Sequence, residues 1–152
     1  MRVGGEEMGR KQVELFVHLV WGTMLRRPMI TPDIEADAYG VVAAKTWELR
    51  CTPVVIGGTA DHLHLLARFP STVPVARLVG EVKGASSHFI NHRLGQTRRF
   101  AWQSGFGAFT IATDDVPALS SYIREQKVHH ARQNVVPMFE LSDSDATSVQ
   151  PR

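Results

Sequence analysis

The sequence predicts an α+β fold of the ferredoxin-like, split βαβ type that RRM domains also adopt. We expect an antiparallel sheet with helices on one face, plus a C-terminal helix that carries Tyr122. Two observations predict this fold. Short segments rich in β-branched and aromatic residues alternate with longer segments whose apolar residues recur at helical spacing. Their order is strand, helix, strand, strand, helix, strand, with one extra helix at the end, and this is the split βαβ order.

The first strand and the first helix have clear signals. Residues 13–21 (VELFVHLVW) are rich in residue types that favour a buried strand. After a loop, Thr31 and Pro32 provide a capping residue followed by a proline at the first helical position. We therefore expect a helix over residues 32–50, whose acidic first turns suit the helix dipole.

The later elements follow from the same patterns. Two apolar runs separated by a short glycine-containing turn predict a hairpin. After the hairpin, the spacing of the apolar residues predicts a helix, then a strand, then a last helix. We expect strands over residues 52–58 and 62–69, a helix over 75–94, a strand over 106–113, and a last helix from Asp114 or Asp115 to Arg132.

The length and composition indicate one soluble domain. The chain has 152 residues, of which 43% are hydrophobic and 21% are charged. We expect a flexible arm over residues 1–12, a single domain over 13–133 and a polar tail over 134–152. We find no apolar run long enough to span a membrane and no secretory signal. The single cysteine, Cys51, excludes an internal disulfide and favours a cytoplasmic location.

The formal net charge is only +2, but the basic residues gather in two places. One is the loop with Arg26 and Arg27. The other lies between residues 77 and 99, where Glu81 is outnumbered by basic residues: Arg77, Lys83, Arg93, Arg98 and Arg99. A local basic field is expected of a nucleic-acid binder. A solvated helix face explains the charge alone equally well.

Two histidines in the strand over residues 62–69 are candidate metal ligands. His62 and His64 should project from one face, roughly 7 Å apart, because alternate strand residues share a face. Leu63 and Leu65 should then point into the helix-packed core. Two such imidazoles can converge on one ion. An isolated His-x-His is more often a structural pair that is hydrogen-bonded to its neighbours.

The last helix carries a second candidate pair. Tyr122 and Gln126 are four residues apart, so they should share a face and lie about 6 Å apart along the axis. A glutamine carbonyl can bind a metal, and a tyrosine phenol can act as a nucleophile. Tyr122 alone could equally be a half-buried core residue. The two pairs together are much more specific than either pair alone.

These residues resemble the single-tyrosine HUH transposases of the 200/605 insertion-sequence family (IS200-like, TnpA-like). The histidine–hydrophobe–histidine motif of that family corresponds to His62-Leu63-His64. The resemblance extends from about Val13 to about Arg132. It also includes His18 and Trp21, the Arg26-Arg27-Pro28 loop, Lys83 to Ser87, Trp102-Gln103, the strand segment 107–110, and Tyr122 to Gln126 followed by His129-His130.

The resemblance implies a transposase that cleaves and rejoins single-stranded DNA through a 5′-phosphotyrosine intermediate. It implies that His62, His64 and Gln126 hold Mg²⁺ or Mn²⁺, and that Tyr122 is the nucleophile. It also implies recognition of hairpins at the ends of an insertion sequence, and a homodimer in which the tyrosine helix can serve its own histidines or those of the partner subunit. Since all three ligands are neutral, we expect weak metal binding without DNA, with a DNA phosphate completing the shell. Imidazole ligands favour Mn²⁺ over Mg²⁺.

Residue type and position suggest further roles. Basic residues and one aromatic residue are candidate DNA contacts: Arg26, Arg27, Lys83, Arg93, Arg98, Arg99 and Trp102. His18 and His129 could contact the site from behind the ligands, although His18 is also a good core residue. Asp61 should point to the face opposite His62, and we expect it to be a turn residue and not a ligand.

Three other functions compete with an active transposase. One is a domesticated relative with the same chemistry at repeated chromosomal sequences. Another is a catalytically silent nucleic-acid-binding module, which would have no reason to keep His62, His64, Tyr122 and Gln126 together. The third is a metal-storage or sensor domain, which the neutral ligands disfavour.

Overall fold

The computed structural model describes residues 12–95 and 99–132. They form a four-stranded antiparallel sheet in the order β2-β3-β1-β4, flanked by helices. The strands are β1 Leu15–Gly22, β2 Thr52–Gly58, β3 His62–Phe69 and β4 Gly107–Ile111. The helices are α1 Pro32–Glu48, α2 Val75–Leu94, α3 Val116–Arg124 and α4 Gln126–Ala131, with 3₁₀ turns η1 Met24–Arg26 and η2 Thr113–Asp115. The expected arm and tail fall outside the described residues, apart from Gln12.

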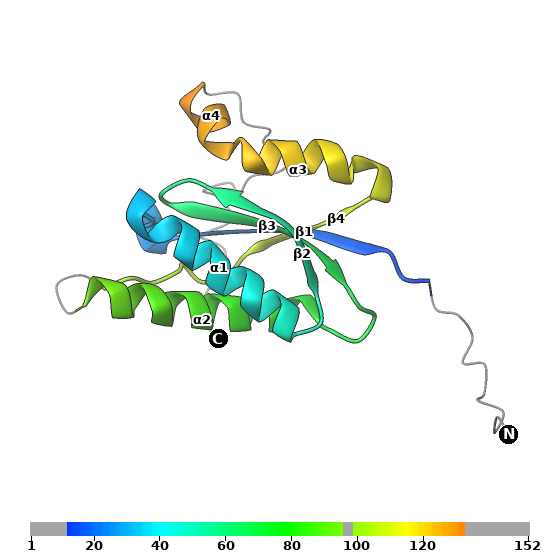
Figure 1. Ribbon diagram of the computed structural model, residues 1–152, viewed down its shortest axis with the longest axis horizontal. Coiled ribbons are helices and arrows are strands. Elements are labelled where there is room, and N and C mark those ends of the chain that lie inside the picture. Colours follow the sequence, from blue (N-terminus) through cyan, green and yellow to red (C-terminus); the bar gives the residue numbers. More distant parts are fainter. Residues whose placement is uncertain (1–11, 96–98, 133–152) are drawn as a thin grey trace, which may run out of the picture.

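The predicted fold class is confirmed. The elements follow one another as βαββαβ before α3, and the two central strands, β1 and β3, pair along their whole length. Helices α1 and α2 cover one face of the sheet, whereas α3 and α4 lie on the opposite face (Figure 1). The sheet is therefore enclosed by two different layers. None of the described helices is long and apolar enough to cross a membrane.

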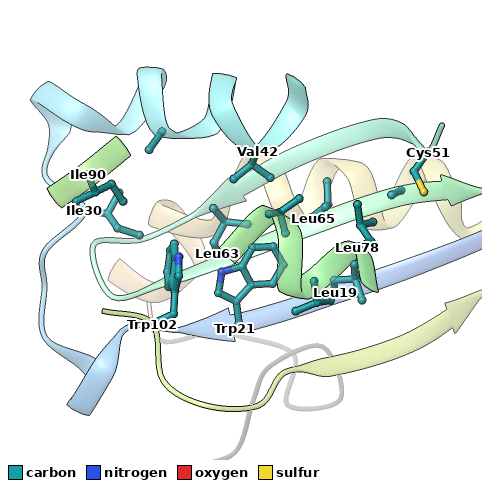
Figure 2. Packing of buried hydrophobic residues seen from close by; sticks show 14 of the residues in the cluster. Leu19, Trp21, Ile30, Val42, Cys51, Leu63, Leu65, Leu78, Ile90 and Trp102 are labelled. Atoms are coloured by element: carbon teal, nitrogen blue, oxygen red, sulfur yellow. The ribbon is translucent and has the colours of Figure 1, made fainter. Parts of the chain in front are cut away.

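The main core lies between the sheet and the α1/α2 layer. Trp21 from β1 and Leu78 from α2 are fully buried there, together with Leu63 and Leu65 from β3 (Figure 2). The alternation along β3 thus sends its leucines at 63 and 65 to this side, as the sequence predicts. Burial of this kind contributes about 1.5–3 kcal/mol per large apolar side chain.

A smaller apolar cluster fixes α3 to the other face. Leu119 and Ile123 of α3 pack against Val55 of β2 and Leu66 of β3, and all four are buried. Tyr122 belongs to the same cluster. The helix that carries the candidate nucleophile is therefore held by apolar contacts to the sheet.

Two helix ends differ from the sequence-based expectation. The last helix is not continuous: it is interrupted at Glu125, which has φ −99° and ψ 20°. Backbone hydrogen bonds from Glu125 to Ser121 (3.1 Å) and from His129 to Glu125 (3.0 Å) bridge the interruption between α3 and α4. The first helix ends at Glu48, because Arg50 adopts a left-handed conformation with φ 64°.

Candidate active site

The two histidines of β3 lie buried on the face covered by α3 and α4. His62 is 1% and His64 is 0% exposed. Their ring centroids are 5.1 Å apart. Two buried imidazoles side by side need polar partners, because an unsatisfied buried nitrogen is costly.

Gln126 reaches this pair from the first position of α4. Its Oε1 lies 3.1 Å from His62 Nε2 and 3.0 Å from His130 Nε2. The rings of His62 and His130 are themselves in contact, with centroids 4.6 Å apart. The carbonyl oxygen of Gln126 therefore sits between two imidazole nitrogens. The i, i+4 spacing of Gln126 and His130 is the signal in the sequence for this contact.

Tyr122 lies beside the second histidine. Its ring centroid is 6.4 Å from that of His64, and the side chain is 8% exposed. His129 stacks on the phenol ring, with centroids 4.6 Å apart and an interplanar angle of 30°. The four residues singled out from the sequence, His62, His64, Tyr122 and Gln126, thus meet within one chain. His129 contacts the tyrosine and also lies 3.7 Å from a carboxylate oxygen of Glu125.

Polar groups of the preceding turn hold Nδ1 of His62, the ring nitrogen that does not contact Gln126. His62 Nδ1 lies 2.7 Å from Asp61 Oδ1 and 2.9 Å from Thr59 Oγ1. The hydrogen bond from His62, aided by the charge of Arg26 at 3.4 Å, lowers the pKa of the Asp61 carboxyl to about 2, although partial burial opposes the shift. The expectation that Asp61 points away from His62 is therefore wrong. At the start of a strand its short side chain can fold back onto the neighbouring ring.

His64 is held in a different way. Its Nδ1 lies 2.8 Å from Nε2 of His18, and the two rings stack with centroids 5.1 Å apart. Both side chains are fully buried. His18 comes from β1, the strand next to β3, so the sheet itself sets this contact. The position matches the supporting role suggested from the sequence.

The donor set suits a divalent metal with neutral ligands. His62 and His64 each have Nδ1 engaged by a neighbouring side chain, the arrangement that orients imidazole ligands in metal sites. No group of three or more His, Cys, Asp or Glu side chains suited to holding a metal occurs in the described residues. A metal held here would therefore need the amide of Gln126 and ligands from outside the chain.

Several expected DNA contacts are engaged inside the protein. Trp102 is 9% exposed and donates its indole N–H to Ser86 Oγ at 2.9 Å, so its ring belongs to the core and is not presented for stacking on a base. Lys83 donates to the backbone carbonyls of Gln103 and Gly105, and burial lowers its pKa to about 8. The structure contradicts the stacking role of Trp102 and gives Lys83 a role in holding this loop.

The arginines differ among themselves. Arg93 forms an ion pair with Asp37 at 2.7 Å, and Arg26 pairs with Asp61. Arg27 and Arg99 are exposed. Arg98 lies outside the described residues. Arg26 is therefore the expected DNA contact that lies nearest the histidines, with its guanidinium 3.3 Å from His62 Nδ1.

Comparison with known proteins identifies the family. Residues 11–126 match the family model described as "Transposase IS200 like". The chain belongs to the IS200-like transposase family. The matched residues include both histidines of β3, Tyr122 and Gln126, whereas His129 and His130 follow shortly after the matched segment. Comparison with curated proteins gave no match.

Two solved structures share the fold of this IS200-like chain. One, from Deinococcus radiodurans R1 and assigned as a transposase, has a TM-score of 0.63 and 19% identity, and the match covers 79% of this chain and 97% of that chain. The other is a REP-associated tyrosine transposase bound to a REP hairpin, with a TM-score of 0.60 and 16% identity, covering 83% of this chain and 74% of that chain. At these identities the likeness concerns the fold alone.

Proposed function

We propose that this transposase cleaves and rejoins single-stranded DNA, with Tyr122 as the nucleophile and His62, His64 and Gln126 as ligands of a divalent metal. The observation that carries the proposal is the meeting of the strand pair with the helix pair inside one chain: Gln126 Oε1 lies 3.1 Å from His62 Nε2, and Tyr122 lies beside His64. Family membership supports the reaction class.

The residues behind the ligands prepare the histidines. With Nδ1–H of His62 donated to Asp61, its Nε2 becomes the basic nitrogen. The contact between His64 Nδ1 and His18 acts in the same way on the second ring. A bound Mg²⁺ or Mn²⁺ would supply charge to the scissile phosphate and align it for attack. Because the proposed protein ligands are neutral, a DNA phosphate would be needed to complete the shell of a bound metal.

Tyr122 takes part in the covalent step. The bond from its phenol oxygen to phosphorus forms as the bond from phosphorus to the 3′-oxygen breaks. The phenol gives up its proton and the leaving 3′-oxygen gains one, so a 5′-phosphotyrosine and a free 3′-hydroxyl result. Rejoining is the reverse displacement, which needs no external energy source. His129, stacked on the ring, keeps the phenol oriented.

We propose hairpin DNA at the ends of an insertion sequence as the partner. The REP-associated relative is bound to a REP hairpin, and the exposed Arg27 and Arg99 are candidate phosphate contacts of this chain. A homodimer would bring two such sites to the two ends of one element. A hairpin from chromosomal repeats is the alternative substrate, with the same chemistry.

The test uses hairpin DNA with a single-stranded flank, labelled at its 3′ end because that fragment stays on the tyrosine. With Mn²⁺ the wild-type protein should give a protein–DNA adduct that survives boiling in detergent. Tyr122→Phe should abolish the adduct and leave DNA binding unchanged. Tyr39→Phe is the matched control, since Tyr39 lies in α1 on the other side of the sheet and should leave the adduct intact.

The metal role is tested separately. His62→Ala should reduce adduct formation at least tenfold, and a chelator should abolish it in the wild type. An adduct that persists in Tyr122→Phe would refute the nucleophile, and cleavage that is insensitive to chelator would refute the metal. If wild-type protein binds the hairpin but never forms an adduct, the silent binding module is the better description.

A further inference from the structure

The residue opposite His64 on the neighbouring strand is a glycine that lies directly under the tyrosine helix. Gly57 of β2 pairs with His64. A Cβ at Gly57 would lie 2.1 Å from the carbonyl oxygen of Ile123 and 2.9 Å from its Cγ2. Real Cβ atoms do not approach other atoms so closely. The backbone of α3 therefore touches the backbone of β2 at a point that no other residue type allows.

The contact lies within the segment that carries both Tyr122 and Gln126. Ile123 directly follows Tyr122 and precedes Gln126 by three residues. Its side chain is fully buried in the cluster that holds α3 to the sheet. A shift of its carbonyl group would move the tyrosine and the glutamine together.

A second tether continues this contact into α4. Lys127 forms an ion pair with Glu35 of α1 and donates to the carbonyl of Gly58 at 3.4 Å. Gly58 follows Gly57 at the end of β2. The segment from Tyr122 to Lys127 is thus attached to its own chain on both sides of the helix interruption.

We infer that Gly57 is a positioning residue that seats the Tyr122–Gln126 segment over His62 and His64. This inference rests on the proposed function and adds to it a residue of β2 that sets how closely the two halves of the site approach each other. The backbone of Gly57 does not have a positive φ, so alanine meets no backbone strain there. An alanine would act by pushing away the Ile123 carbonyl.

The experiment compares Gly57→Ala with Gly80→Ala. A Cβ at Gly80, on the exposed side of α2, would have no atom within 4 Å, so it is a matched glycine control. Gly57→Ala should lower the rate of adduct formation with hairpin DNA at least tenfold and weaken Mn²⁺ binding, measured by electron paramagnetic resonance without DNA. Its hairpin affinity and cooperative unfolding should persist. Gly80→Ala should match the wild type in all readouts.

The outcomes distinguish a failure of the positioning role of Gly57 from a failure of the proposed function. If Gly57→Ala forms adduct at the wild-type rate and binds Mn²⁺ normally while Tyr122→Phe is inactive, the seating role is refuted and the proposed function stands. If wild type and Gly80→Ala form no adduct, the proposed function itself fails. Loss of Mn²⁺ binding and of adduct in Gly57→Ala alone supports the inference.

Discussion

The α1/α2 face of the sheet is covered by an apolar core, whereas the α3/α4 face combines a smaller apolar cluster with buried histidines, although the same strands build both. On the α1/α2 face, β1 and β3 contribute Trp21, Leu63 and Leu65 to a continuous apolar core. On the α3/α4 face, the same strands contribute the histidines at 18, 62 and 64. One face holds the chain together, which allows the other to bury polar groups at some cost in stability.

The polar groups of the second face are arranged in pairs. His62 contacts Asp61, His64 contacts His18, and Gln126 contacts His130. In both His62 and His64 a supporting group engages Nδ1, so the pairs also orient the rings. Burial therefore serves stability on both faces, and on the α3/α4 face it also orients the histidine rings.

The largest effect should come from the apolar face. Leu65→Ala should lower the free energy of unfolding by about 2–5 kcal/mol, because the side chain is fully buried between sheet and helices. Urea unfolding measures the loss. Mn²⁺ affinity of the folded variant should not change, since Leu65 points away from the histidines. A loss below about 1 kcal/mol, or a large fall in Mn²⁺ affinity, would break the distinction between the faces.

An intermediate effect is expected at His18. His18→Ala removes the partner of His64 Nδ1 and should weaken Mn²⁺ binding about 10–100-fold, the usual range for losing such a support. His88→Ala, at an exposed position of α2, is the control and should bind Mn²⁺ like the wild type. Unchanged Mn²⁺ affinity in His18→Ala would mean that His18 is only a core residue.

The sequence predicted the regular parts of both faces. The alternation of strand 62–69 assigned Leu63 and Leu65 to the core and the histidines to the other side, and the bounds of helix 75–94 agree with α2. These features depend on local periodicity, which a single sequence contains. The spacing of Tyr122 and Gln126 also predicted that the two side chains share one side of the helix, and both lie beside the histidines even though the helix is interrupted between them.

The contacts that depend on chain packing were not predictable. The fold-back of Asp61 onto His62 is a side-chain rotation, and the contact of Gly57 with Ile123 joins segments far apart in the sequence. Trp102 looked like an exposed aromatic because its loop is polar, yet its ring completes the main core. Lys83 was expected to contact DNA because of its charge. The sequence does not reveal that the carbonyls of Gln103 and Gly105 lie within hydrogen-bonding distance of its ammonium group.

The smallest effect is expected at Lys83. It tests whether this lysine near the apolar face is engaged within the fold or is available to DNA. Burial lowers its pKa from the ordinary 10.5 to about 8. Below pH 8 the lysine is protonated in both the folded and the unfolded chain, and its partly buried charge destabilises the folded chain. Between about pH 8 and 10.5 the unfolded chain binds more protons than the folded chain, so the stability contribution of Lys83 rises with pH.

The expected rise is about 1–2 kcal/mol, because solvent screening and the two carbonyl acceptors offset part of the burial cost. Other groups also titrate in this range, so the informative quantity is the difference between wild type and Lys83→Met in urea unfolding at pH 7.5 and pH 10. That difference should shift in favour of the wild type at the higher pH. Parallel pH profiles would mean that the ammonium is solvated and available to DNA, as its place in the basic segment suggested.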